Sequence, residues 1–444
     1  MLCLKDGWLA YLVEGRTGEP FGVVVKDIAG EQSLQPPIDS RQDLLALAMG
    51  RAGSIAPAAR AWLDEQGLLQ EKDDLYDPVL AARLRELDAG YGHLPREAPA
   101  DPGLARLYEI TLAAHSTRKV HSPSFFQHPV LPESCLRRAL LIDRFGPRQR
   151  VLLVGDDDLV SVPLAALGHS AVVVDIDGYL LELLDRLAGQ WDLPLATRSW
   201  DLADPVPEDL AGERFDVFLT DPIYSANAIR LFVSRGWSCL APGGRAVVAF
   251  GGYAAPIIEQ FAADCGLTVE ACHWGFNHYL DPLKLTHEVY TAPLWVFRRT
   301  GAERGLIPAD ARFEADLYHE RAYLRMNIGL DFAGVDAAAL DAATLLELAA
   351  GLLAGAQSRR TVPLPGGDFL CLASGAGAAA VLEARRRAAL VSVDLHGIPA
   401  LEPAGLERLA TALGVEPYIH CCYPRGGGAE YDSFAYRAPR LRRR

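Results

Sequence analysis

Several features that define common protein classes are missing from this chain of 444 residues. Its eight cysteines include no CxxC pair, so the sequence offers no zinc ribbon and no thioredoxin-like redox motif, and we expect no metal site. Scattered thiols are typical of proteins of the reducing cytoplasm. The first fifteen residues lack a basic region followed by a clean apolar stretch, so we expect no signal peptide and a cytoplasmic location.

Long apolar runs and an excess of positive charge are also missing. The segment TLLELAAGLLAGA (344–356) is short and is interrupted by Glu347, so it predicts a buried helix and no membrane span. Acidic residues outnumber basic ones by 57 to 43, for a formal net charge of -14. An acidic surface disfavours non-specific binding of nucleic acid and is compatible with cationic small molecules.

Helical periodicity is present through the first hundred residues. The stretch 41–70 gives two amphipathic segments broken by Gly53 and Pro57, which resembles a small winged-helix unit. It carries no basic recognition stripe, so a scaffold or dimerisation role in a homodimer is favoured over DNA binding. PREAPADPG (95–103) is a candidate linker. We therefore predict an N-terminal helical, winged-helix-like domain over residues 1–100.

Residues 101–300 are predicted to form a Rossmann-like α/β domain. Short β-branched runs such as AVVVD (171–175) alternate with helical patterns such as YLLELLDRLAG (179–189). This alternation predicts βαβ units and a doubly wound, mostly parallel sheet. Ligands on such sheets bind outside the carboxyl ends of the strands, near the switch point of the topology.

Residues 301–444 are predicted to form a smaller α/β domain. Residues 301–355 read as mainly helical and rich in Ala and Leu. Beyond them, strands are expected at DFLCLAS, ALVSVDL, PYIHCCY and DSFAYR, with helices through VLEARRRA (381–388) and GLERLATALG (405–414). Short apolar runs predict the strands, and longer segments with helical periodicity predict the helices.

Carboxylates follow four successive strands of the central domain. The first strand, VLLV, stops at Gly155, and the second ends at Asp175, from which a carboxylate can accept hydrogen bonds from ribose hydroxyls. The third ends near Asp201, which can accept from an adenine amino group, and the fourth ends at Asp221. Four strand-end carboxylates in register favour a nucleoside-type site.

The first of these loops is unusual because Asp156, Asp157 and Asp158 replace the expected glycines. In S-adenosylmethionine methyltransferases, this loop and the following helix receive the carboxylate of the cofactor. Three aspartates would repel that carboxylate and favour a ligand with only cationic groups there. Decarboxylated S-adenosylmethionine and polyamines are such ligands. The alternative is that one or two of the aspartates only cap the helix.

The fourth strand is followed by TDPIYSAN (220–227). Pro222 removes a backbone donor and stops the strand at the site. Tyr224 offers a ring for stacking and a hydroxyl for hydrogen bonding, and this role is favoured over the alternative of a half-buried strand-end aromatic. A similar DP-x-Y sequence occurs in amino-group methyltransferases, where the Asp accepts a hydrogen bond from the nucleophilic amine.

Five segments together resemble the bis-aminopropyl spermidine synthase (branched-chain polyamine synthase) family: SFFQHPVLPES (124–134), GDDDLVSVPLA (155–165), VVDID (173–177), FDVFLTDPIYSANAIRLFVSRG (215–236) and FNHYLDPLKLTHEVYTAPLWVFRR (276–299). The resemblance implies transfer of an aminopropyl group from decarboxylated S-adenosylmethionine to an amine, with release of methylthioadenosine. The chain departs from the family at Ile223 and Tyr224, where a second proline and often an acidic residue are usual. That departure leaves the acceptor amine open.

The resemblance implies that Asp156, Asp157 and Asp158 line the aminopropyl and acceptor pocket, that Asp221 takes the acceptor amine and that Asp175 holds ribose. The full set of candidates adds the residues predicted from position alone. The catalytic candidates are Asp158, Asp221 and Tyr224, and the candidates for binding the co-substrate are Gly155, Asp156, Asp157, Asp175, Asp177 and Asp201. At the other end of the chain, SVDLHG (392–397) and PYIHCCYP (417–424) weakly resemble bacterial S-adenosylmethionine decarboxylases, without a match to their pyruvoyl-forming serine.

Two alternatives stay open at this point. The first is a methyltransferase or amino-carboxypropyl transferase that uses intact S-adenosylmethionine on a small amine. The second is a non-catalytic sensor of polyamines or nucleosides that uses the N-terminal helical unit to bind DNA.

Overall fold

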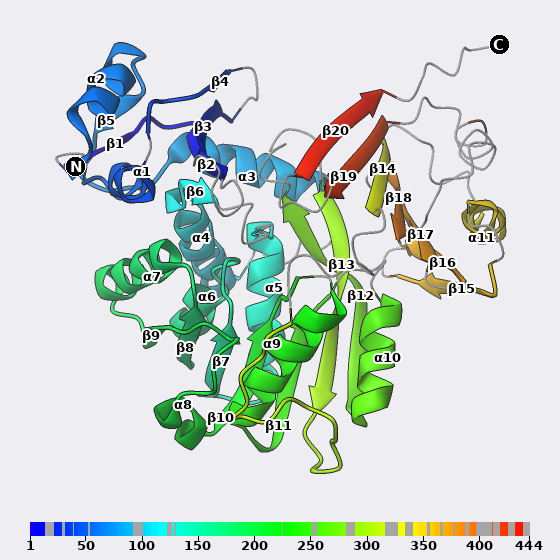
Figure 1. Ribbon diagram of the computed structural model, residues 1–444. Coiled ribbons are helices and arrows are strands. Elements are labelled where there is room, and N and C mark those ends of the chain that lie inside the picture. Colours follow the sequence, from blue (N-terminus) through cyan, green and yellow to red (C-terminus); the bar gives the residue numbers. More distant parts are fainter. Residues whose placement is uncertain are drawn as a thin grey trace.

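The computed structural model describes residues 1–13, 22–28, 32–38, 40–51, 54–91, 101–121, 127, 130–223, 225–250, 255–280, 289–315, 327–333, 341–352, 356–364, 367–375, 378–386, 390–396, 411, 418–424 and 431–437 (Figure 1). These residues form four sheets: one of two strands, one of four, and two of seven. The central seven-stranded sheet positions the candidate site.

The N-terminal part contains both predicted helical segments of 41–70, but it is not mainly helical. It comprises β1 (Leu2–Leu4), β2 (Trp8–Val13), β3 (Gly22–Asp27), β4 (Ser33–Leu34), α1 (Arg41–Ala48), α2 (Pro57–Glu65), β5 (Leu69–Glu71) and α3 (Pro78–Tyr91). Pro57 begins α2, where its missing N–H costs nothing. The prediction missed the strands because they are short and gain stability only by pairing with distant segments, as β1 does with β5.

The predicted boundary near residue 100 is crossed by close contacts. After α4 (Pro102–Thr117), the short strand β6 (Val120–His121) pairs in parallel with β2 in the four-stranded sheet. The buried Lys119 forms an ion pair with the buried Asp77, which also caps α3 by accepting hydrogen bonds from its first turn. The N-terminal part is therefore tied to the central part by both backbone pairing and charge.

The predicted doubly wound sheet is confirmed. Its strand order is β12-β13-β11-β10-β7-β8-β9. The parallel strands are β7 (Arg150–Val154), β8 (Ser170–Asp175), β9 (Leu195–Ser199), β10 (Phe215–Thr220) and β11 (Leu240–Ala249); β12 (Thr268–Leu280) and β13 (Val289–Arg298) complete it as an antiparallel pair. The chain winds outward from β7 in one direction and then returns to β10, so the switch point lies between these neighbours.

Helices cover both faces of this sheet (Figure 1). On one face pack α5 (Pro132–Asp143), α6 (Ser161–Ala166) and α7 (Gly178–Trp191), and on the other pack α8 (Glu208–Glu213), α9 (Ala226–Cys239) and α10 (Ala255–Cys265). In β7, Val151 and Leu153 face one core while Leu152 and Val154 face the other, and all four are fully buried. An uninterrupted apolar run is what a strand buried on both faces requires.

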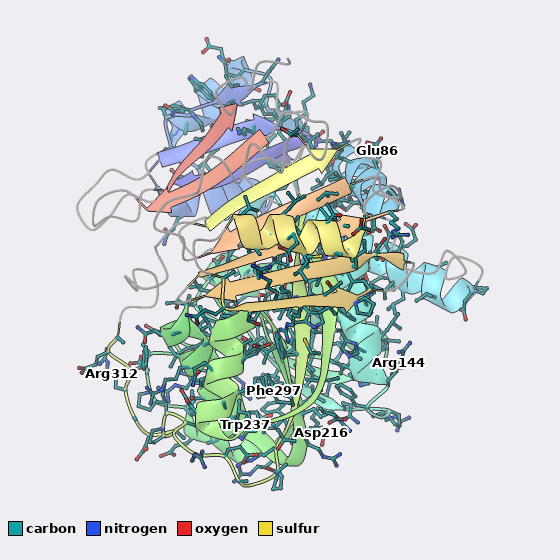
Figure 2. All side chains as sticks on the ribbon, turned by 90° about the vertical axis from the view of Figure 1, so that its right-hand side faces the viewer. Glu86, Arg144, Asp216, Trp237, Phe297 and Arg312 are labelled. Carbon is teal, nitrogen blue, oxygen red and sulfur yellow. The ribbon has the colours of Figure 1, made fainter. Side chains whose placement is uncertain are left out.

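The C-terminal part is a seven-stranded antiparallel sheet with one helix described. Its strands are β14 (Asn327–Ala333), β15 (Ser358–Pro363), β16 (Phe369–Gly375), β17 (Ala378–Arg385), β18 (Leu390–His396), β19 (Tyr418–Pro424) and β20 (Tyr431–Arg437). The helix α11 (Ala342–Gly351), capped by Asp341, lies across β15, β16 and β17 (Figure 2).

Two predictions for this part are wrong. The segment predicted as a helix through VLEARRRA is strand β17, and residues 301–355 contain β14 besides α11. In β17 the consecutive residues Ala380, Val381 and Leu382 are all buried, so pairing with β16 and β18 overrides the local helix propensity. The strands expected at DFLCLAS, ALVSVDL, PYIHCCY and DSFAYR are confirmed as β16, β18, β19 and β20. The helix predicted at 405–414 lies outside the described residues, apart from residue 411.

Candidate functional site

The acidic loop after β7 is bounded by two residues in the left-handed backbone region. Gly155 has a φ of 77°, and its N–H donates to the carbonyl of Val174 on β8 at 2.9 Å. Leu159, 1% exposed, has a φ of 58°, which is unfavourable for a branched side chain. Backbone strain of this kind persists where the surroundings enforce it and often marks functional loops.

Asp156 acts as a cap for α6. Its Oδ1 accepts from the Val160 N–H at 2.8 Å and its Oδ2 from the Ser161 N–H at 3.2 Å. The side chain is buried, and burial raises its pKa to about 8. Both oxygens are thus engaged by the protein, as expected for the capping interpretation of this loop.

Asp158 is also turned inward. Its Oδ1 accepts from the Val130 N–H at 3.1 Å, and its Oδ2 forms an ion pair with Arg138 of α5. Both side chains are almost fully buried. Asp158 therefore anchors the loop to α5.

Asp157 differs from its two neighbours. It is half-buried, and within the described part of the chain no hydrogen bond reaches its carboxylate. Burial raises its pKa well above the usual range, and repulsion from Asp158, Asp221 and Asp175 adds to that shift. The Arg118 guanidinium donates to the Asp157 carbonyl and opposes the shift. Of the three aspartates, Asp157 has the carboxylate that a cationic ligand can still use.

The loop after β8 carries two aspartates with different environments. Asp175 accepts from the Asp177 N–H at 2.8 Å, and burial raises its pKa to about 6. Asp177 caps α7 by accepting from the Tyr179 N–H at 3.1 Å, and its other oxygen accepts from the Gln127 amide at 2.8 Å. Both Asp177 oxygens are therefore engaged within the fold. Between the two carboxylates, Ile176 is 50% exposed.

The remaining predicted carboxylates lie at the ends of β9 and β10. Asp201 is exposed and accepts from the Ala203 N–H at 2.9 Å, a local turn contact that does not tie it to the other carboxylates. Asp221 Oδ2 accepts from Arg138 at 2.8 Å and from the Tyr279 hydroxyl at 2.7 Å. Burial raises the pKa of Asp221 to about 7, against the opposing influence of Arg138. Tyr224 lies outside the described residues.

Four of these side chains form one electrostatic unit, which we call the acidic cluster: Asp157, Asp158, Asp175 and Asp221. They come from the ends of β7, β8 and β10, at the switch point of the sheet. The edge strand β9 contributes Asp201, which stands apart. The structure thus brings together the carboxylates nearest the switch point, where ligands bind in doubly wound sheets.

Sequence reasoning missed the buried cation that organises this cluster. Arg138 is fully buried and contacts Asp158, Asp221, Asn277 and Tyr279. Within LRRALL of α5 it looks like one more helical arginine, and no local pattern distinguishes it. Only its burial, which is unusual for arginine, reveals it.

No helix in the described part of the chain is long and apolar enough to span a membrane. Among those same residues, no three or more His, Cys, Asp or Glu side chains are grouped as a metal ion would require. The six cysteines for which a state is described, Cys3, Cys135, Cys239, Cys265, Cys272 and Cys371, are free thiols.

Comparisons with known proteins agree with the resemblance seen in the sequence. The N(4)-bis(aminopropyl)spermidine synthase of Thermus thermophilus is 36% identical over 135 residues, which cover 30% of this chain and 39% of that protein. The enzyme of the same name from Thermococcus kodakarensis is 38% identical over 127 residues, covering 27% and 35%. The chain therefore spans less than half the length of these curated relatives.

Among solved structures, a mutein of the branched-chain polyamine synthase of Thermus thermophilus, in complex with N4-aminopropylspermidine and 5'-methylthioadenosine, is 25% identical. The match covers 63% of this chain and 84% of that one, with a TM-score of 0.45. The family model described as the branched-chain polyamine synthase A C-terminal domain matches residues 108–283, the part that carries the acidic cluster. This central part of the chain is similar to the branched-chain polyamine synthase family both in the family model and in the curated relatives.

Proposed function

We propose that this protein transfers an aminopropyl group from decarboxylated S-adenosylmethionine to an amine, releasing methylthioadenosine. The observation that carries the proposal is the charge balance at the switch point. The four carboxylates of the acidic cluster face two guanidinium groups, Arg118 and Arg138, so the fully ionised set has two negative charges in excess. Burial makes that excess unfavourable until a cation arrives.

Decarboxylated S-adenosylmethionine matches this excess because it carries a sulfonium and a primary ammonium and no anion. Intact S-adenosylmethionine adds a carboxylate, which would have to sit near Asp157. At an effective dielectric of about 20, two like charges about 6 Å apart repel by about 3 kcal/mol. This repulsion is enough to favour the decarboxylated donor by about a hundredfold.

The loop after β8 supports a nucleoside at the same site. Asp175 ends its strand beside the acidic loop, where a carboxylate can accept hydrogen bonds from ribose hydroxyls. The exposed Ile176 next to it offers an apolar surface to a purine base, and such a side chain is otherwise unfavourable in water. Together they would hold the adenosyl part while the acidic cluster holds the aminopropyl part.

The chemistry proposed is an in-line displacement. The lone pair of the acceptor amine attacks the methylene carbon next to sulfur, the carbon–sulfur bond breaks, and its electrons stay on the sulfur of methylthioadenosine. The nitrogen that has attacked becomes cationic and loses a proton. In this proposal Asp221 assists through Oδ1, and this role is supported by the hydrogen bonds from described residues, which fall on Oδ2. Alignment and proton removal are what such a step needs from a protein, because the sulfonium is already a good leaving group.

The test is a pair of calorimetric titrations, one with each form of the nucleoside, followed by incubation with a panel of amines and mass detection of products. We expect preferential binding of the decarboxylated form and release of methylthioadenosine. Asp157→Asn should abolish that preference, whereas Asp264→Asn, the same change at an exposed position of α10, should not. Preference for intact S-adenosylmethionine would instead indicate a methyltransferase or amino-carboxypropyl transferase. Binding without turnover of either nucleoside would indicate a sensor.

A further inference from the structure

Arg138 makes a hydrogen bond or an ion pair with each of four side chains from three other parts of the central domain. Its Nη1 is paired with Asp158, which follows β7, and its Nη2 donates to Asp221 at 2.8 Å, after β10. The same Nη2 donates to the Tyr279 hydroxyl on β12 at 2.9 Å. The Nε donates to Asn277 Oδ1 at 2.7 Å. A single guanidinium thereby fixes the distance between two strand-end loops.

The orientation of this guanidinium is itself fixed. The Asn277 amide nitrogen donates to the carbonyls of Ala292 and Pro293 at 3.3 and 3.2 Å, so its oxygen must point toward Arg138. Arg235, the second fully buried arginine among the described residues, is different. The hydrogen bonds described for its guanidinium all go to backbone carbonyls, such as those of Leu202 and Ala311. Arg235 ties segments of chain together, whereas Arg138 holds carboxylates.

We propose that Arg138 is a positioning residue for Asp221. It binds Asp221 through Oδ2, together with Tyr279, and so turns Oδ1 toward the acceptor amine. Because its one positive charge is shared with Asp158, it compensates Asp221 only in part and leaves that carboxylate able to take up a proton. This inference rests on the proposed function, in which Asp221 receives the proton of the attacking amine.

The charges around Asp221 are consistent with this role. Arg138 faces it from α5, Tyr279 from β12, and Asp157 and Asp158 from the loop after β7. Burial raises the pKa of Asp221 to about 7; Arg138 lowers it and Asp158 raises it. A base with a pKa near the working pH is the most effective proton acceptor.

The test is the pH dependence of kcat/KM for the wild type and for Arg138→Met, Arg138→Lys and Tyr279→Phe. The acid limb is the fall of kcat/KM at low pH, where Asp221 becomes protonated. Because loss of the cation raises the pKa of Asp221, this limb should move upward by about 1–3 pH units in Arg138→Met and be partly restored in Arg138→Lys. Tyr279→Phe, which keeps the cation and removes one donor to Asp221, should give a smaller upward shift. It also keeps the inference testable if Arg138→Met does not fold.

The matched control is Arg235→Met, which removes another buried guanidinium, one whose described hydrogen bonds all go to backbone carbonyls. It should lower stability without moving the acid limb. If Arg138→Met and Tyr279→Phe lower turnover but leave the acid limb of the kcat/KM profile at the wild-type pH, Arg138 has only a structural role and the inference is overturned.

A separate readout distinguishes this result from failure of the proposed function. If the wild type releases no methylthioadenosine with any amine, proton uptake or release on binding of spermidine is measured calorimetrically in buffers of different ionisation enthalpy. The pH at which this proton exchange is half complete should rise in Arg138→Met and Tyr279→Phe and stay unchanged in Arg235→Met. No difference among these variants would overturn the inference.

Discussion

Adjacent aspartates of the acidic loop should respond in opposite directions to the same substitution. In Asp158→Asn, the buried Arg138 loses one of its two carboxylates. Breaking a buried ion pair typically costs about 3–5 kcal/mol, and we expect about 3 kcal/mol because Asp221 still partners the guanidinium.

In Asp157→Asn the sign is reversed, because this carboxylate has neighbours that repel it. Repulsion between the Asp157 carboxylate and a like charge about 6–8 Å away lowers the stability of the folded state by about 2–3 kcal/mol at an effective dielectric of about 20. Attraction to Arg118 offsets part of that loss. We expect a net gain of about 1–2 kcal/mol at a pH at which Asp157 is ionised in the folded wild type. At about 2–4 °C per kcal/mol for a domain of this size, the melting temperature should rise by about 2–8 °C.

The gain in Asp157→Asn should depend on pH. The folded pKa of Asp157 is raised by burial, so the folded protein holds this proton more tightly than the unfolded chain does. The wild type therefore loses stability as the pH rises from about 4 through the folded pKa, and the variant avoids that loss. The gain should grow as the pH rises through the folded pKa of Asp157 and should vanish near pH 4.

The assay is thermal unfolding of the wild type and both variants at pH 4, 5, 6 and 8, with methylthioadenosine release measured in parallel. Asp157→Asn should be more stable than the wild type and inactive, which is the trade-off expected when a strained charge serves function. If both substitutions lower the melting temperature equally, or the effect of Asp157→Asn is independent of pH, the division of roles within the loop is refuted.

Two further predictions concern stability alone. In Gly236→Ala the new Cβ would clash with the Phe218 ring, so we expect the free energy of unfolding to fall by about 1–3 kcal/mol. The control Gly212→Ala lies on α8 with no neighbour within 4 Å and should be neutral or slightly stabilising. Denaturant unfolding measures both. Lys119→Met leaves the buried Asp77 without its cation and should cost about 3–5 kcal/mol. Recovery of that loss in the double variant Lys119→Met/Asp77→Asn would identify the charge as its cause, and no recovery would exclude it.

Secondary structure was predictable where one local pattern dominated. The apolar run of β7 and the alternation that follows it predicted the doubly wound sheet, because a strand buried on both faces must be apolar throughout. The strand β17 was wrongly predicted as a helix. Its stability comes from pairing with β16 and β18, and local propensity carries no information about those partners.

The sequence by itself determined that carboxylates gather at the switch point, because a parallel sheet places all its carboxyl ends at one edge. It did not separate Asp156, Asp157 and Asp158, which are chemically identical neighbours. Only the tertiary structure decided that the first caps α6, that the second is half-buried with no described hydrogen bond to its carboxylate, and that the third pairs with Arg138. Those roles depend on which groups α5, β10 and β12 bring within hydrogen-bonding distance, and that is a property of the packed chain.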